Sequence, residues 1–189
     1  MKLVVAVTGA TGAIYAVRLL KALKARQVEV HLILSRWAGE TLHLETGLTE
    51  EDIRHLASYY YKEENLTAPV ASGSFRHQGM VIVPCSMKTL AAIAHGYAEN
   101  LIVRAADVTI KEGRKLILVP RETPLNAIHL ENMLALARLG VTIMPPMPAF
   151  YYRPQSIDDL VEHLVDRILD HLGLEGGTAT RWRGGKKGF

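Results

Sequence analysis

The chain of 189 residues is poor in cysteine, in long apolar runs and in motifs of the common nucleotide sites. Cys85 is the single cysteine, so an internal disulfide is excluded and a reducing, cytoplasmic location is expected. No apolar run approaches the length needed to cross a bilayer, and the first residues are typical of a strand rather than a signal peptide. We therefore expect no membrane association.

Excess charge is also scarce, apart from the last residues. The net charge is +3, but residues 181–189 carry four of the 22 basic residues and no acid, which leaves 18 basic and 19 acidic residues before them. A nucleic-acid-binding domain normally spreads basic charge over one face of its fold. The balance therefore argues against a nucleic-acid partner.

Several catalytic signatures are missing as well. The eight histidines show no metal-ligand spacing such as HExxH, so no metal is expected, and no GxSxG elbow occurs. Cys85 has no neighbouring histidine in the sequence, so a small buried residue is favoured over a nucleophile. Neither a Walker A motif nor GxGxxG is present, which removes the main support for ATP or a dinucleotide.

Strands alternate with helices along the chain. Near-continuous apolar runs predict strands that are buried on both faces, as in parallel sheets. Such alternation predicts a single α/β domain with a three-layer, doubly wound parallel sheet, covering residues 1–180 and followed by a basic tail, 181–189. Residues 57–79 are the least regular part of the chain. Strands are expected at 2–8, 28–34, 80–83, 115–119 and 141–144, and helices from about 14 to 23, at 40–46, from 49, and at 89–95, 101–111, 130–139 and 157–172.

Ligands in such sheets bind at the carboxyl ends of the strands, and each predicted strand ends in polar or aromatic residues. The first strand leads into Thr8-Gly9-Ala10-Thr11-Gly12-Ala13, whose small residues and following helix start suit a phosphorylated cofactor, although a plain tight turn has the same pattern. The later strand ends leave similar alternatives open. Ser35 can cap a helix or bind phosphate, and Ser86–Thr89 can be an anion site or a cap with an exposed lysine. Arg121 and Glu122 can act in a site or form a surface ion pair. Tyr151–Arg153 combine aromatic rings with a cation.

Seven ordered motifs give the chain a family resemblance. It resembles the flavin prenyltransferases, the UbiX/Pad1 family formerly described as aromatic acid decarboxylases, from Lys2 to about Trp182. The motifs are TGATGAIY (8–15), SGSF (72–75), PCSMKTL (84–90), RAADVTIKE (104–112), LVPRETPL (118–125), HLENM (129–133) and PAFYYRPQS (148–156).

The resemblance implies a flavodoxin-like (Rossmann-like) fold and a homo-oligomer, usually a dodecamer, with FMN near subunit interfaces. It also implies an activity: a metal-independent transfer of a dimethylallyl group from dimethylallyl phosphate to N5 and C6 of reduced FMN. The prenylated FMN would serve a UbiD-type decarboxylase, as in ubiquinone biosynthesis.

Site residues follow from the resemblance by motif position. FMN binding is implied for Gly9, Ala10, Thr11, Ser35, Ser86, Met87, Lys88, Thr89 and Arg121. Binding of the prenyl phosphate, often across subunits, is implied for Tyr151 and Arg167, with Arg104 and Lys111 near the same phosphate. Glu122 matches a glutamate that handles the flavin proton, Glu45 another glutamate of the site, and Trp182 an aromatic residue that closes over it. Many family members have serine where this chain has Thr11.

Two other functions are alternatives to prenyl transfer. An FMN-dependent decarboxylase acting on cysteine peptides or related substrates would need a histidine early in the second helix and a P-x-M-N motif. This chain has Arg36-Trp37-Ala38-Gly39 and Pro145-Pro146-Met147-Pro148 there. A non-catalytic FMN-binding subunit of a decarboxylase would not need Lys111, Glu122, Tyr151 and Arg167 together. Direct decarboxylation of aromatic acids is the older description of the family.

Overall fold

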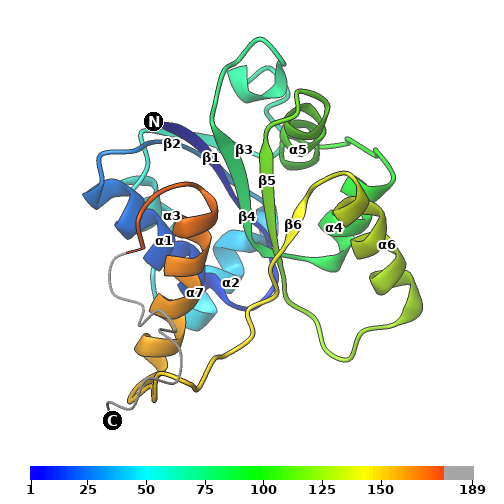
Figure 1. The fold of residues 1–189 in the computed structure, drawn as a ribbon. Helices are drawn as coiled ribbons and strands as arrows, with labels where there is room; N and C mark the ends of the chain where they lie inside the picture. The colour runs from blue at the N-terminus through cyan, green and yellow to red at the C-terminus, as the bar shows by residue number, and fades with distance from the viewer. Residues whose placement is uncertain (177–189) are drawn as a thin grey trace. The chain divides into compact units, whose positions relative to one another are not determined.

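The computed structural model describes residues 1–176. These residues contain a six-stranded, wholly parallel sheet and seven α-helices (Figure 1). The strands are β1 (Lys2–Val7), β2 (Glu29–Leu34), β3 (Tyr59–Lys62), β4 (Gly79–Cys85), β5 (Lys115–Pro120) and β6 (Thr142–Ile143). The helices are α1 (Ala13–Ala25), α2 (Arg36–Thr46), α3 (Glu50–Arg54), α4 (Met87–Ala94), α5 (Leu101–Lys111), α6 (Ala127–Arg138) and α7 (Ile157–His171), with a 3₁₀ turn, η1, at Pro69–Ala71.

The strand order is β3-β2-β1-β4-β5-β6, so the chain winds outward in one direction from β1 and in the other from β4. This doubly wound, flavodoxin-like topology confirms the predicted fold class. Alternate residues of the strands face opposite sides of the sheet. Val4, Ala6, Met80 and Ile82 pack with residues of α4 and α5. Helix α1 contacts β2 and β4 and lies on the other side of the sheet from α4 and α5 (Figure 1).

The chain forms two compact units, residues 1–146 and the part that begins at Met147. The first holds the sheet and helices α1–α6; the second, in the described residues, holds α7. The predicted boundary between a domain ending at 180 and a basic tail lies outside the described residues and stays a prediction.

Some predicted elements were misplaced. Five strands were expected, but a sixth, β3, forms inside the segment that was judged irregular, because Tyr59–Lys62 pair with His31–Leu34 at the sheet edge. Helix α2 begins at Arg36 rather than near residue 40, and α6 begins at Ala127, where Asn126 caps it by accepting from the backbone N–H of His129. By contrast, α5 has the predicted limits.

Candidate functional site

Thr8 joins the carboxyl ends of β1 and β4, where the strand order reverses. Its buried hydroxyl donates to the carbonyl of Pro84 at 2.9 Å and accepts from the backbone N–H of Ser86 at 2.8 Å. The reversal point of a doubly wound sheet is where ligands bind. Thr8 therefore fixes the two strand ends on which a ligand site would be built.

Gly9 lies directly against α2. A Cβ atom at Gly9 would come within 2.5 Å of the Trp37 Cβ and 3.3 Å of the Trp37 carbonyl carbon. The hydroxyl of Thr41 donates to the Gly9 carbonyl at 3.2 Å. The fold itself thus requires glycine here, in addition to any ligand that needs a close backbone approach.

The amino terminus of α1 already holds a carboxylate. Glu45, on α2, accepts from the backbone N–H of Gly12 at 2.9 Å and of Ala13 at 2.8 Å through Oε2. Gly12 has a positive φ of 106°, a conformation that favours glycine. A carboxylate at a helix amino terminus is favourable because it satisfies unpaired N–H groups and interacts with the helix dipole.

This contact corrects the sequence interpretation of the loop. The start of α1 was expected to offer free N–H groups to a phosphate, but those of Gly12 and Ala13 are taken by a residue more than thirty positions away. Within residues 1–176, the backbone N–H groups of Gly9, Ala10 and Thr11 have no protein acceptor. The part of the loop left for a ligand therefore lies at Gly9–Thr11.

Ser35 occupies the position before α2, but its side chain does not cap that helix. Glu63 does so instead: its carboxylate accepts from the backbone N–H of Arg36 at 2.6 Å and from the amide of Asn100 at 2.9 Å. The Glu63 carbonyl also accepts from the N–H of Leu101 at 2.7 Å, which ties the start of α5 to the end of β3. The sequence favoured capping for Ser35; the structure leaves its hydroxyl available to a ligand.

Ser86 caps α4, as one of the two alternatives for this strand end predicted. Its hydroxyl accepts from the backbone N–H of Thr89 at 3.3 Å and donates to the Thr89 hydroxyl at 3.1 Å. Met87 is half-buried, whereas the Lys88 side chain is 80% exposed and lies 3.4 Å from a carboxylate oxygen of Glu99. Ser86–Thr89 thus form a capped helix start with an exposed, weakly held lysine.

Arg121 and Glu122 follow β5 in an exposed loop. The Arg121 backbone N–H donates to the Cys85 carbonyl at 3.3 Å, which keeps the ends of β4 and β5 together. Glu122 accepts from the backbone N–H of Thr123 at 3.1 Å. In the part of the chain that the structure describes, no ion pair joins Arg121 to Glu122, so the surface ion pair considered from the sequence does not form.

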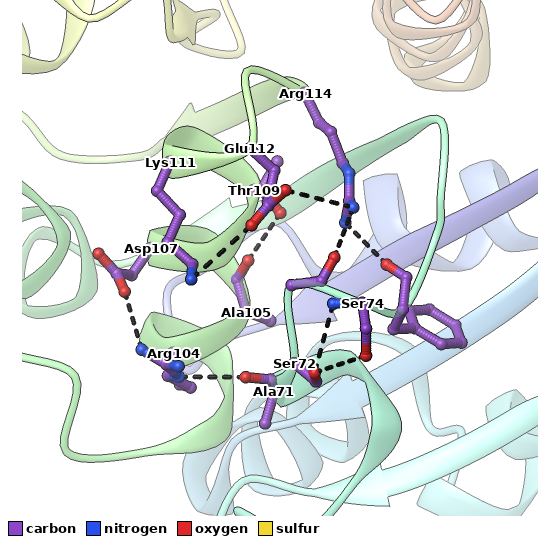
Figure 2. A network of polar contacts seen from close by, with 12 residues as sticks. Ala71, Ser72, Ser74, Arg104, Ala105, Asp107, Thr109, Lys111, Glu112 and Arg114 are labelled. Carbon is purple, nitrogen blue, oxygen red and sulfur yellow. Dashed lines mark hydrogen bonds and ion pairs between the residues drawn. The ribbon is translucent and has the colours of Figure 1, made fainter.

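Arg104 and Lys111 lie in a second polar region, on α5 beside η1 (Figure 2). Arg104 donates through Nε to the Ala71 carbonyl at 3.1 Å and through Nη1 to Asp107 at 3.0 Å. The Nζ atom of Lys111 is 3.7 Å from a carboxylate oxygen of Glu112. Both cations are partly exposed and held by acidic neighbours on their own helix or just beyond it.

Arg114 holds the loop 72–75 against this region (Figure 2). It donates to the Phe75 carbonyl at 2.7 Å and to the Gly73 carbonyl at 2.8 Å. A Cβ atom at Gly73 would collide with the Glu112 carboxylate. Ser72 and Ser74 share a hydrogen bond of 2.9 Å. No role for Arg114 follows from the sequence, because its hydrogen bonds go to backbone carbonyls about forty residues away. Its guanidinium also lies 3.9 Å from a carboxylate oxygen of Glu112.

Lys111 and Arg121 lie at opposite ends of the parallel strands. Lys111 ends α5 at the amino end of β5, whereas Arg121 follows the carboxyl end of that strand. The six residues of β5 span about 20 Å at about 3.3 Å per residue. Within one chain, therefore, the structure does not bring Lys111 to the strand ends that carry Gly9, Ser86 and Arg121.

In the unit that begins at Met147, Tyr151 and Arg167 both lie near His163. The Tyr151 hydroxyl lies 2.8 Å from Nε2 of His163, and the Tyr152 ring stacks on His163 with 4.9 Å between centroids. Burial and then the charge of Arg167 lower the pKa of His163, while Asp166 acts in the opposite direction. Arg167 itself lies 3.5 Å from a carboxylate oxygen of Asp170.

His163 was missed in the sequence analysis. It stands four residues before Arg167, a spacing that places two side chains on one face of a helix. That spacing was the one signal in the sequence that could have linked His163 to the predicted phosphate-binding residue.

The structure tests the prediction for Cys85 but not the one for Trp182. Cys85 is fully buried, as expected, and burial raises the pKa of its thiol. Trp182 lies outside the described residues. Within residues 1–176, no group of three His, Cys, Asp or Glu side chains is arranged to hold a metal ion, and no helix is long and apolar enough to cross a membrane.

Known proteins match this chain along nearly its whole length. The Flavoprotein family matches residues 1–169. A probable UbiX-like flavin prenyltransferase of Streptomyces sp. (strain D7) is 58% identical over 185 residues, covering 97% of this chain and 92% of that protein.

Two crystal structures are also similar. A dodecameric FMN-dependent UbiX-like decarboxylase from Escherichia coli O157:H7 has a TM-score of 0.96 and 56% identity, covering 97% of this chain and 100% of that one. AnUbiX (PadA1) in complex with FMN and dimethylallyl pyrophosphate has a TM-score of 0.96 and 50% identity, covering 98% of each chain. By these similarities, the chain belongs to the Flavoprotein family and, within it, to the UbiX-like flavin prenyltransferases.

Proposed function

We propose that this chain is a flavin prenyltransferase that binds FMN and joins a dimethylallyl group to N5 and C6 of its reduced form. The observation that carries the proposal is the similarity, at 50% identity and a TM-score of 0.96, to a protein crystallised with FMN and dimethylallyl pyrophosphate. The strand ends of this chain support it, because they place backbone N–H groups and hydroxyls at the reversal point of the sheet.

The residues present at these strand ends fit FMN. Gly9, Ala10 and Thr11 offer backbone N–H groups without protein acceptors in the described residues, and the uncapped hydroxyl of Ser35 follows the neighbouring strand. Ser86–Thr89 and Arg121 would supply hydroxyl, amide and guanidinium donors. Since Glu45 holds the N–H groups of Gly12 and Ala13, we assign the FMN phosphate to the donors of the other strands rather than to the start of α1.

The leaving phosphate of the prenyl donor needs cations and hydrogen-bond donors. We assign this role to Arg167 and Tyr151, with His163 holding the Tyr151 hydroxyl in position. Charge on the leaving oxygen develops as the carbon–oxygen bond breaks, and fixed positive groups stabilise that charge more than they stabilise the intact donor. The phosphate leaves with the bonding electron pair, and the allyl group is transferred to the flavin.

Lys111 and Arg104 would reach the same phosphate from another subunit. The length of β5 separates Lys111 from Arg121 by about 20 Å within one chain. A second copy that presents its α5 to the strand ends would remove this separation. Glu122, in the exposed loop after β5, is our candidate for the group that accepts the proton lost from C6 when the ring closes.

The finer parts of the proposal follow the family. We propose a dimethylallyl mono- or diphosphate as the donor, a homododecamer, a cytoplasmic location and delivery of prenylated FMN to a UbiD-type decarboxylase. Trp182, which lies outside the described residues, is proposed to close over the site. The cysteine-type decarboxylase is disfavoured by Arg36–Gly39 and Pro145–Pro148, which lack its histidine and its P-x-M-N motif.

The test is anaerobic incubation of the protein with reduced FMN and dimethylallyl monophosphate, with the diphosphate in a parallel sample. The released flavin should gain the mass of one dimethylallyl unit, and a sample without donor should gain none. A Glu122→Gln variant keeps the shape of the side chain but not its basicity, so it should bind FMN normally and form product more slowly. Bound FMN with no mass gain from either donor would exclude the proposal, and release of CO2 from an aromatic acid by this protein alone would favour a decarboxylase.

A further inference from the structure

Arg114 is fixed just after α5 by both its backbone and its side chain. Gly113 has a positive φ of 64°, and the Arg114 N–H donates to the Thr109 carbonyl at 2.9 Å, as in a Schellman helix ending. The guanidinium donates to the carbonyls of Gly73 and Phe75, and the side chain is only 16% exposed. The positive charge of Arg114 is therefore held at one place in the fold.

The carboxylate of Glu112 lies between two cations, Lys111 and Arg114 (Figure 2). One of its oxygens is 3.7 Å from Nζ of Lys111, and the other is 3.9 Å from Nη2 of Arg114. The Lys111 side chain is 50% exposed, far more than that of Arg114. Water and salt screen exposed charges more strongly than partly buried ones, so Arg114 is the more lasting partner of Glu112.

Gly73 lies against the same charged groups. A Cβ atom at Gly73 would collide with the Glu112 carboxylate and would lie 3.5 Å from Nζ of Lys111. The loop 72–75, whose carbonyls hold Arg114, thus also limits where the Glu112 carboxylate can lie. As a result, Glu112 stays beside Arg114 whether or not Lys111 remains paired with it.

A carboxylate next to Lys111 opposes the binding of a phosphate there. If Lys111 turns to the phosphate, Glu112 loses one partner and comes to lie near a like charge. Asp107, one helical turn before Lys111, is held by Arg104 at 3.0 Å. Glu112 needs a similar partner, and Arg114 is placed to serve as one.

We propose that Arg114 is a positioning residue of the prenyl phosphate site, where it compensates the charge of Glu112 and leaves Lys111 available to the phosphate. Arg114 acts through Glu112 and Lys111 and does not touch the donor, because Nη1 and Nη2 both donate to carbonyls of the loop 72–75. The inference rests on the proposed function, which assigns Lys111 to the phosphate of the donor.

The test measures donor affinity without turnover. Dimethylallyl monophosphate is titrated by calorimetry into the protein loaded with oxidised FMN, the form that the proposed reaction does not use. The diphosphate replaces it if the wild type binds only the diphosphate. Arg114→Gln removes the charge and should raise the Kd of the donor about fivefold, as expected for the loss of one charge interaction. Arg114→Lys keeps the charge and should stay within about twofold of the wild type.

Arg26→Gln is the matched control. Arg26 follows α1, also donates to a backbone carbonyl, that of Ala22 at 3.0 Å, and has no proposed role in the site. Its replacement by glutamine removes the same charge and should leave the Kd of the donor unchanged.

Glu112→Gln separates charge compensation from a role in loop shape alone. In Glu112→Gln/Arg114→Gln no carboxylate remains to be compensated, so the Kd of the donor should return to within about twofold of the wild type. If Arg114 only shaped the loop, the double variant would bind as weakly as Arg114→Gln. Glu112→Gln alone should bind the donor at least as tightly as the wild type, and it decides the matter if circular dichroism shows that Arg114→Gln is unfolded.

The outcomes separate this inference from the proposed function. An unchanged Kd in folded Arg114→Gln, no recovery in the double variant, or weaker binding in Glu112→Gln would each overturn the inference. A wild-type protein that binds the donor and responds to these substitutions as expected, but forms no prenylated flavin, would fail the proposed function alone. A wild-type protein that binds neither donor would overturn both.

Discussion

The carboxyl edge of the sheet and the three predicted phosphate-binding cations are held in different ways. At the sheet edge, Thr8 and Glu45 bond to backbone groups at 2.8–2.9 Å, and Gly9 is packed against the backbone of α2. The three cations instead pair with nearby acidic side chains, and within residues 1–176 only Arg104 among them also donates to a backbone carbonyl, that of Ala71. Arg104 pairs with Asp107 at 3.0 Å, Lys111 with Glu112 at 3.7 Å, and Arg167 with Asp170 at 3.5 Å.

The difference indicates which part of the site is formed before a ligand arrives. Backbone-centred hydrogen bonds at the ends of buried strands change only if the sheet changes. The cations are exposed by 38% to 51%, and exposed ion pairs contribute little stability. A phosphate can therefore compete for Lys111 and Arg167 at small cost, because charge-assisted bonds to phosphate replace a weak pair. We expect FMN binding to depend on the fold and donor binding to depend on single side chains.

Gly9→Ala is the strongest test of the preformed edge. The new Cβ atom would lie 2.5 Å from the Trp37 Cβ, so α2 must move, and overpacking of this kind costs about 1–3 kcal/mol. We expect a lower melting temperature together with lost FMN binding, measured by thermal unfolding and flavin fluorescence. Gly47→Ala is the control: Gly47 has a positive φ of 70° and open space around it, so it should lose stability but keep FMN binding. Normal FMN affinity in Gly9→Ala would refute the idea of a rigid edge.

Arg167→Ala tests the cation side of the comparison. Removing a charge-assisted contact worth about 1.5–3 kcal/mol should raise KM for the prenyl donor about 10- to 100-fold. FMN affinity should change little, since the sheet edge is untouched. The control is Arg54→Ala, which breaks another pair between residues three apart, with Glu51 at 2.8 Å, where neither residue has a proposed role in the site. Equal losses of donor use and FMN affinity would show that the two regions are not separate.

The sequence predicts the sheet edge better than the side chains that complete it. Continuous apolar runs mark β1, β2 and β5, so the positions of Gly9, Ser35 and Arg121 at strand ends follow from local pattern. Strand β3 has no such apolar run. It forms because Tyr59–Lys62 pair with β2 at the outer edge of the sheet, and local sequence does not reveal that pairing. Glu45 matched a family position, but its contact with the start of α1 depends on how α2 packs, which no local spacing reveals.

His163 allows a test by pH. Its lowered pKa means that the unfolded chain binds a proton more readily than the folded chain. The stabilisation is thus complete above the usual histidine pKa of about 6.5 and is lost as the pH falls through the lower folded value. In His163→Phe, the drop in melting temperature between pH 7.5 and pH 5 should be smaller than in the wild type by at most about a few degrees. His31 and His77, whose pKa values are also lowered, remain in both proteins. An identical pH dependence in the two proteins would show that His163 is not held neutral beside Arg167.

Thr11→Ser should have the smallest effect. Thr11 is exposed, and within residues 1–176 its hydroxyl has no protein partner, so serine keeps the donor and removes only one methyl group. Exposed substitutions usually change free energies by less than about 0.5 kcal/mol, which is about a twofold change in FMN affinity. Thr11→Val is the matched variant, because it keeps the branched shape and removes the hydroxyl. If FMN affinity, measured by fluorescence titration, falls more in Thr11→Val than in Thr11→Ser, then Thr11 holds the flavin through its hydroxyl. The reverse order would place the methyl group against the flavin, and the preformed edge would then include a side chain as well as the backbone.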